Sequence, residues 1–261
     1  MEIVITSEPN DAADIAADAV QLLLADLAHP VLGLATGSSP LPTYRELIRR
    51  YDSGRLTFGH VRAFLLDEYV GLGTDHPQTY RAFIEREFTS QVDLPAQALA
   101  GPDGASSELA AAAPQYEALI ADAGGIDLQL LGIGSDGHIG FNEPGSSLGS
   151  RTRLKTLTDE TRADNARFFD GDIETVPRHV LTQGIGTILE ARHLVLIATG
   201  EAKAAPIALA VEGPLTAMVP ATALQLHPHA TIIIDEPAAQ ALLHADYYRQ
   251  AYANKPEWQH I

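Results

Sequence analysis

The chain of 261 residues carries a formal net charge of −17, and its 46% hydrophobic and 20% charged residues are ordinary globular usage, which excludes disordered and fibrous classes. The acidic excess disfavours nucleic acid and anionic membrane surfaces as partners, because both are negatively charged. With no cysteine, the chain has no disulfide, no thiolate nucleophile and no cysteine-ligated metal.

The length favours a single domain that covers residues 1–261. The N-terminal residues show no basic region followed by a long apolar stretch, and no window is apolar over the length of a bilayer span. We therefore expect a cytoplasmic protein that is attached to no membrane.

Strands and helices alternate along the chain. The first helix is expected to place one apolar stripe against the core, made of Ile15, Ala19, Leu22, Leu23 and Leu27. Five short apolar runs are predicted to be buried strands: Val31 to Ala35, Val61 to Leu66, Ile126 to Ile133, His193 to Ala198 and Thr231 to Ile234. This order predicts an α/β fold with a mostly parallel, doubly wound (Rossmann-like) sheet and helices on both faces. Ligands are then expected at the carboxyl ends of the strands.

The first apolar run ends in a loop rich in hydroxyl groups. Thr36, Gly37, Ser38 and Ser39 lead into a helix that we expect to begin near Pro40. Backbone N–H groups, the helix dipole and the hydroxyls together favour a bound phosphate. The alternative is that Ser38 or Ser39 only caps the helix, and the sequence leaves both interpretations open.

The second apolar run ends in Asp67 and Glu68. A carboxylate at this edge of the sheet, partly desolvated by Phe64 and Leu66, is a stronger base than it is in water. The alternative is a solvated strand end.

The third run leads into residues 130–144, where Asp136, His138 and Glu143 lie within eight positions. A carboxylate beside an imidazole supports its charged form, so that His138 takes and returns a proton near neutral pH. The alternative is an ordinary turn with a solvated histidine. There is no second histidine at metal-ligand spacing, so we expect no metal ion.

Residues 157–180 are polar and interrupt the alternation of strands and helices. They are interpreted either as a lid over the site or as a plain surface excursion. Arg167 in this segment and Lys203 after the fourth run are candidate partners of the phosphate, with ordinary surface cations as the alternative.

Several segments together resemble one family over nearly the whole chain. They are LGLATGSSP, LLDEYVGL, GIGSDGHIGFNEPGSSLGSRTRLKTLT, the residues from Arg167 to Phe169, ALAVEGP and LQLHPHATIIIDEP. These segments are similar to those of the glucosamine-6-phosphate deaminase (glucosamine-6-phosphate isomerase) family. The resemblance implies conversion of glucosamine 6-phosphate and water to fructose 6-phosphate and ammonia, in amino sugar metabolism, without a cofactor.

The resemblance also implies residue roles. Asp67 would move the proton from carbon 2 to carbon 1, and His138, oriented by Asp136 and Glu143, would open the pyranose ring. The groups that would hold the substrate phosphate are Thr36, Gly37, Ser38, Ser39, Arg167 and Lys203.

A regulatory site is implied as well. Ser146, Arg151, Arg153 and Lys155 resemble the inter-subunit site where N-acetylglucosamine 6-phosphate activates hexameric members. This implies a homo-oligomer, a hexamer being one form, although some members are neither hexameric nor activated. A solvated basic strand is the alternative.

Two rival functions remain. A 6-phosphogluconolactonase shares the fold and a Gly-x-Asp-Gly-His loop, but in that family the loop typically continues as His-Thr-Ala-Ser-Leu-Phe-Pro. Here the histidine is followed by Ile-Gly-Phe-Asn-Glu-Pro. A sugar-phosphate sensor without turnover is the other rival, and the presence of Asp67 and His138 disfavours it.

Overall fold

A seven-stranded parallel sheet forms the centre of the computed structural model, which describes residues 1–256, 258, 259 and 261. Its strands, in spatial order, are β1 (Glu2–Thr6), β10 (Ala230–Asp235), β9 (His193–Ala198), β6 (Leu128–Leu131), β2 (Val31–Leu34), β3 (Arg62–Leu65) and β5 (Leu99–Ala100). Every neighbouring pair is parallel. The predicted doubly wound α/β fold is confirmed.

The five predicted apolar runs are the five inner strands, and the two edge strands were not predicted. An inner strand of a parallel sheet is covered on both faces and is therefore apolar throughout. The edge strand β1 keeps polar residues at both ends, and β5 has only two residues. Neither edge strand presents the continuous apolar run by which the inner strands are recognised.

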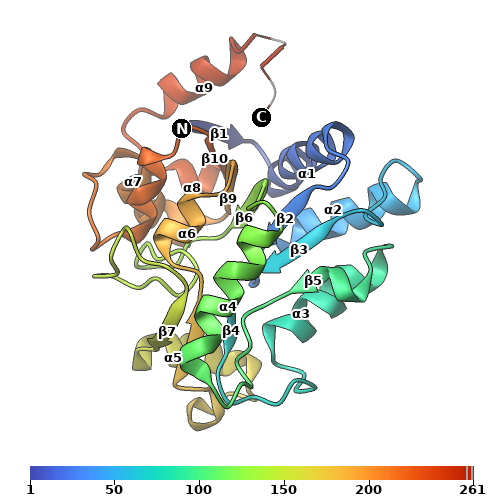
Figure 1. Ribbon diagram of the computed structural model, residues 1–261. Coiled ribbons are helices and arrows are strands. Elements are labelled where there is room, and N and C mark those ends of the chain that lie inside the picture. The colour runs from blue at the N-terminus through green and yellow to red at the C-terminus, as the bar shows by residue number, and fades with distance from the viewer. Residues whose placement is uncertain (257, 260) are drawn as a thin grey trace.

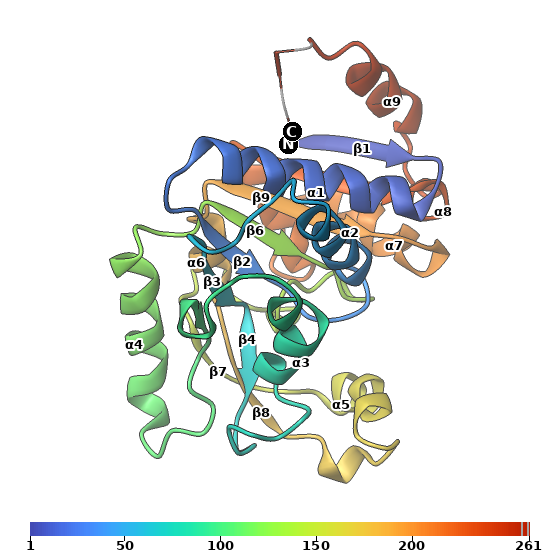
Figure 2. The ribbon, with the colours of Figure 1, turned by 90° about the vertical axis from the view of Figure 1, so that its right-hand side faces the viewer.

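Helices cover both faces of this sheet (Figures 1 and 2). One face packs against α1 (Pro9–Asp26), α2 (Leu41–Asp52) and α3 (Tyr80–Glu87). The other packs against α4 (Leu109–Asp122), α6 (Ile185–Leu189), α7 (Ala204–Glu212) and α8 (Glu236–Ala239). Alternate residues of a strand serve the two cores: in β9, Leu194 and Leu196 face one core, and Val195 and Ile197 face the other.

The predicted apolar stripe of the first helix is wrong in part. The buried side of α1 consists mainly of alanines with Val20 and Leu24, whereas Ile15 is only half-buried and Leu27 lies beyond the helix end, 38% exposed. Small side chains let the helix backbone lie close to the sheet and to α2, so the closest contacts fall on alanine rather than on leucine.

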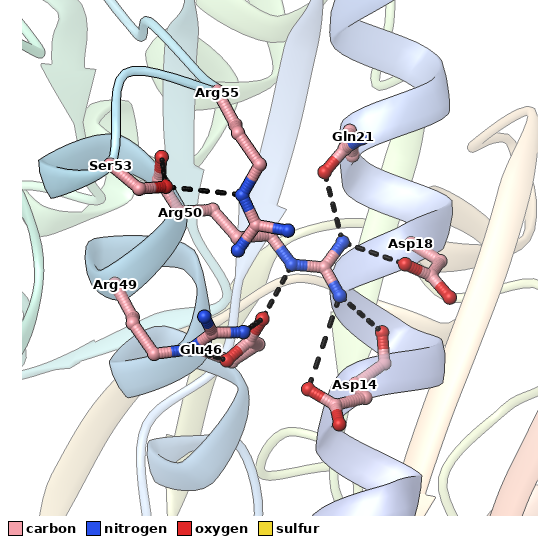
Figure 3. A network of polar contacts seen from close by, with 8 residues as sticks. All are labelled: Asp14, Asp18, Gln21, Glu46, Arg49, Arg50, Ser53 and Arg55. Carbon is pink, nitrogen blue, oxygen red and sulfur yellow. Dashed lines mark hydrogen bonds and ion pairs between the residues drawn. The ribbon is translucent and has the colours of Figure 1, made fainter.

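A charged network joins α1 to α2 and is shown in Figure 3. The guanidinium of Arg50 is almost fully buried; its Nε lies 2.6 Å from Oε1 of Glu46 and its Nη1 lies 2.7 Å from Oδ1 of Asp18. Arg50 also donates to Oε1 of Gln21 and to the carbonyl of Asp14. These partners satisfy a cation that is costly to bury alone.

A second, antiparallel sheet of three strands extends from the β3 side of the large sheet, away from β1 (Figure 2). Its order is β4 (Asp67–Tyr69), β8 (His179–Thr182) and β7 (Arg153–Thr156). Thr182 is paired with Asp67 on one side and with Arg153 on the other. This small sheet was not predicted, and it places a candidate catalytic residue and a candidate regulatory residue in one row.

The remaining elements flank the two sheets. The predicted lid region contains α5 (Asp159–Asn165) and two short 3-10 turns, and α9 (Ala245–Ala253) lies beside the β1 edge (Figure 1). Among the described residues, no helix has both the length and the apolar character of a membrane span.

Candidate active site

A cavity of about 600 Å³ opens at the carboxyl ends of β2, β3 and β6. Its walls come from the loops that follow these strands, from α3, from the predicted lid region and from Lys203. The largest part of the cavity wall thus lies where the predicted apolar runs end, and the location of function in this cavity stays a prediction. All three of the sequence motifs that follow the first three runs contribute to it.

The loop of Thr36, Gly37, Ser38 and Ser39 lines the cavity. Gly37 has a φ of +97°, a conformation that favours glycine. The N-cap position of α2 is Pro40, which makes no side-chain capping hydrogen bond. The structure thus gives the two serines no capping role at this helix, and both line the cavity beside its N-terminus.

The two cations predicted as phosphate partners, Lys203 and Arg167, line the same cavity. Lys203 donates from Nζ to the carbonyl of Ile133 at 2.7 Å, and Arg167 also lines the cavity. Burial lowers the pKa of Lys203, and the charge of Arg167 lowers it further. The two like charges are close enough to repel each other, so a bound anion would relieve an existing electrostatic cost.

Asp67 is the buried carboxyl group of the cavity. Its residue is 4% exposed and lies at the start of β4, directly after the end of β3. Burial raises the pKa of Asp67 well above its ordinary value, and the neighbouring carboxylate of Glu68 adds to the shift. Of the two flanking groups expected from the sequence, Leu66 lines the cavity, whereas Phe64 packs against Tyr116 in the core.

Glu68, the adjacent acid, has a structural role. It accepts backbone N–H bonds from Tyr69 at 2.8 Å, from Tyr80 at 2.9 Å and from Arg81 at 3.0 Å. Its carboxylate therefore satisfies the N-terminus of α3, where unpaired N–H groups need an acceptor. The two adjacent acids are separated by the strand pleat, and only Asp67 belongs to the cavity wall.

His138 and Asp136 form a pair at the side of the cavity. Nδ1 of His138 lies 2.7 Å from Oδ1 of Asp136, and the same oxygen accepts the backbone N–H of His138 at 3.1 Å. The contact with His138 lowers the pKa of Asp136. This close contact leaves Nε2 of the ring for a second partner, and an orienting role of Asp136 toward His138 stays a prediction.

Glu143 has a different partner from the one expected. Its Oε1 accepts a hydrogen bond at 2.6 Å from Oγ1 of Thr161 on α5, and Glu143 is not part of the cavity wall. The structure thus brings Asp136 to His138 and connects Glu143 to the predicted lid region instead. An orienting role of Glu143 toward His138 stays a prediction.

The predicted lid region forms one wall of the cavity through α5 and the residues that follow it. Phe169 from this region packs edge-on against Tyr69 with ring centroids 5.5 Å apart, and Tyr80 stacks on Phe141 at 5.9 Å. These four aromatic rings line the cavity. They were not predicted, because they come from four separate segments of the chain, and their meeting carries no periodic signal in the sequence.

The four candidate regulatory residues lie outside the cavity wall. Arg151 is paired with Glu117 and with Glu190. Arg153 donates from Nη1 to Oδ1 of Asn142 at 2.8 Å. The hydroxyl of Ser146 is buried without a hydrogen-bond partner, and Lys155 shares one side of β7 with Arg153.

Within the described residues, no three histidine or carboxylate side chains are grouped as a metal ion would require. A reaction without a metal or cofactor stays a prediction, and the candidate groups for it in the cavity wall include Asp67, Asp136 and His138.

Comparisons with known proteins agree with one another. The family model of glucosamine-6-phosphate isomerases/6-phosphogluconolactonase matches residues 9–233. The chain is 56% identical to the glucosamine-6-phosphate deaminase of Mycolicibacterium smegmatis over 261 residues, 100% of both chains. It is 58% identical to that of Beutenbergia cavernae over 259 residues, 99% of both chains.

Two solved structures place the fold. One, described as a monomeric glucosamine-6-phosphate deaminase, aligns with a TM-score of 0.90 at 39% identity and covers 92% of this chain and 100% of its own. A 6-phosphogluconolactonase from Trypanosoma cruzi aligns with a TM-score of 0.71 at 20% identity, over 93% of this chain and 97% of its own. The second likeness shows the fold alone.

Proposed function

The chain belongs to the family of glucosamine-6-phosphate isomerases and 6-phosphogluconolactonases, and we infer that its activity is that of a glucosamine-6-phosphate deaminase. The substrate is glucosamine 6-phosphate, which reacts with water to give fructose 6-phosphate and ammonia. Relatives of that name match the chain over its full length at 55–58% identity. The lactonase structures are far more distant in sequence.

We propose that the substrate phosphate binds between the Thr36–Ser39 loop and the two cations, Lys203 and Arg167. The support is that a loop at a helix N-terminus, with hydroxyls that do not cap the helix, and two mutually repelling cations line the same cavity. The sugar then extends toward Asp67 and His138.

The imidazole of His138 is proposed to open the pyranose ring by giving a proton to the ring oxygen while the hydroxyl on carbon 1 loses one. Asp136 holds the ring nitrogen that faces away from the substrate. The open-chain aldehyde places the proton on carbon 2 next to a carbonyl group, where it is acidic enough for a carboxylate to remove.

Asp67 is proposed to take that proton from carbon 2 and return it to carbon 1. This leaves an imine at carbon 2, which water attacks, and ammonia then departs to give the ketose. The observation that carries this assignment is a buried carboxyl group in the cavity wall whose pKa is raised by burial. A carboxyl group of this kind can hold the proton between the two transfers.

The decisive experiment is ammonia release from glucosamine 6-phosphate by the purified protein with no added metal. A parallel assay follows hydrolysis of 6-phosphogluconolactone. Ammonia release without lactone hydrolysis is the expected result. Lactone hydrolysis alone would favour the lactonase, and binding without either reaction would favour a sensor.

We further propose that an anionic sugar phosphate binds at Ser146, Arg153 and Lys155 and activates the enzyme, with N-acetylglucosamine 6-phosphate as the activator. The support is an unpartnered buried hydroxyl, together with two cations on one side of β7. Arg151 is the weakest candidate for this site, because its guanidinium is already paired with two carboxylates. An increase in rate with the acetylated sugar would support the site, and an unchanged rate would refute it.

A homo-oligomer, with a hexamer as one form, is proposed together with that regulation, and sedimentation would measure it. The solved relative described as monomeric makes a monomer the clear alternative outcome. We also propose a cytoplasmic role in breaking down N-acetylglucosamine, because phosphorylated sugars carry charges that do not cross a bilayer unaided.

A further inference from the structure

Asn142 is a buried side chain that connects three parts of the proposed site. It is 0% exposed and does not line the cavity. Its Nδ2 donates to the carbonyl of Ile139 at 2.9 Å and to the carbonyl of Gln183 at 2.8 Å. Its Oδ1 accepts from Nη1 of Arg153 at 2.8 Å. The amide group uses both of its protons and its oxygen.

The first contact fixes the loop that carries His138. Ile139 follows His138 directly, and the backbone N–H of Asn142 also donates to the Ile139 carbonyl at 3.2 Å. The carbonyl of His138 accepts from the N–H of Gly134 at 2.9 Å. Hydrogen bonds thus hold the carbonyls of both His138 and Ile139, and Asn142 supplies those to Ile139.

The second contact leads to Asp67 through Gln183, which is also fully buried. The backbone N–H of Gln183 donates to the carbonyl of Leu66 at 2.8 Å, and its Nε2 donates to the carbonyl of Leu65 at 3.0 Å. Leu66 directly precedes Asp67. Gln183 therefore holds the backbone that leads into Asp67, and Asn142 in turn donates to the carbonyl of Gln183.

The third contact leads to the small sheet. Arg153 and Asp67 are the two partners of Thr182 in neighbouring strands. The hydroxyl of Thr182 also accepts the N–H of Phe141, which lies in the His138 loop. The row of Asp67, Thr182 and Arg153 is therefore joined to that loop at two places.

We propose that Asn142 is a positioning residue for the deaminase reaction, which holds His138 and Asp67 at a fixed separation and connects both to Arg153. The inference rests on the proposed function. All polar groups of the Asn142 side chain are paired within the protein, and a fully satisfied buried group holds its partners rigidly. A displacement of about 1 Å of a catalytic group lowers a rate by about 100-fold, so the separation of the two groups decides the rate.

The side chain is specific for this task. Two donors and one acceptor on a single short group are available only in an amide. In Asn142→Asp the two donors are replaced by an oxygen that faces two carbonyls, while the contact with Arg153 is kept. Arg153→Met removes only the third contact. Arg62→Met is the matched control, since Arg62 is an exposed arginine at the start of β3, outside the cavity.

The test measures kcat and KM for ammonia release in the two single variants and the control. We expect Asn142→Asp to lower kcat by about 100-fold while KM stays within about threefold, because the phosphate contacts are intact. Arg153→Met should lower kcat by about tenfold. Arg62→Met should match the wild type.

Amide hydrogen exchange supplies a readout that needs no turnover. In Asn142→Asp the amides of Gly134 and Gln183 should exchange faster together, while those of β9 and β10 stay protected. If Asn142→Asp does not fold, exchange of the Gly134 and Gln183 amides in Arg153→Met tests the inference instead.

Wild-type kcat in Asn142→Asp and in Arg153→Met would overturn the inference. Faster exchange throughout the core in Asn142→Asp would also overturn it. If the wild type releases no ammonia, the proposed function fails, and exchange still decides whether Asn142 connects the two segments.

Discussion

The two ends of the large parallel sheet both bury titratable side chains, but in different surroundings. At the carboxyl ends, Asp67 lies in the wall of a cavity, and its pKa is raised by burial. At the amino ends, His193 is buried against His229, with ring centroids 3.7 Å apart, and its Nε2 lies 3.0 Å from Oγ1 of Thr231. Burial lowers the pKa of His193 to about 3.

A shifted pKa therefore does not by itself identify a reactive group. The pKa of Asp67 is raised and that of His193 is lowered, and both shifts favour the neutral form, as burial requires. Only Asp67 has room beside it for a substrate, whereas the ring of His193 is covered by protein. We therefore expect substitutions at the carboxyl ends of the strands to change mainly activity, and substitutions at the amino ends to change mainly stability.

Asp67→Asn is the change with the largest expected effect. It should lower kcat by about 1,000-fold, because an amide cannot take up a proton and general base catalysis contributes about 10²–10⁴-fold. Substrate binding, measured by calorimetry, should be kept. The thermal midpoint near pH 7 should rise, because the raised pKa of Asp67 means that its charged form destabilises the fold.

The matched control lies at the opposite end of the sheet. Asp127 is a buried carboxylate that accepts the N–H of Val31 at 2.8 Å and pairs with Arg192. Asp127→Asn should lower the thermal midpoint and leave kcat unchanged. Equal losses of activity in Asp67→Asn and Asp127→Asn would show that the two ends of the sheet do not differ in their effect on catalysis.

Lys203→Met should have the next largest effect and should act on binding. Loss of a charged hydrogen bond to the phosphate is expected to raise KM by about 10- to 100-fold, from a contribution of about 1.5–3 kcal/mol. Arg192→Met, which removes a cation at the amino end, should leave KM unchanged. Initial rates against substrate concentration give both values, and a normal KM in Lys203→Met would remove Lys203 from the phosphate site.

His193 should make stability depend on pH. Its pKa is about 3 in the folded protein, well below the ordinary histidine value of 6.5 that the unfolded chain is expected to show. The unfolded chain therefore binds more protons between these pH values, and the unfolding free energy falls as the pH drops through this range. The slope from this one group approaches about 1.4 kcal/mol per pH unit.

Urea unfolding at several pH values measures this dependence. His193→Gln should flatten the curve relative to the wild type below pH 6.5, whereas His29→Gln, at an exposed histidine near the same end, should not. Parallel curves for the wild type and His193→Gln would show that the buried ring is not the group that responds.

The smallest effect is expected away from both ends. Arg249 on α9 is exposed and pairs with Glu236 at 2.6 Å and with Asp246 at 2.8 Å. Arg249→Met should change the unfolding free energy by less than about 1 kcal/mol, since exposed ion pairs contribute little. Activity should be unchanged. A large loss of either would mean that α9 matters more to the site than its position indicates.

The inner strands, the fold class and the position of the cavity could be predicted from the amino-acid sequence alone. Continuous apolar runs are required wherever a parallel strand is covered on both faces. The order of strands and helices then places the motifs of Thr36, Asp67 and His138 at one edge of the sheet. Local patterns are sufficient for these conclusions.

Which groups meet across that edge became known only from the folded chain. The row of Asp67, Thr182 and Arg153 depends on pairing between strands far apart in the chain. The partners of Asn142 and Glu143 are likewise distant or on another element. Hydrogen bonds of this kind leave no periodicity in the sequence, because they depend on distance and angle in space rather than on spacing along the chain.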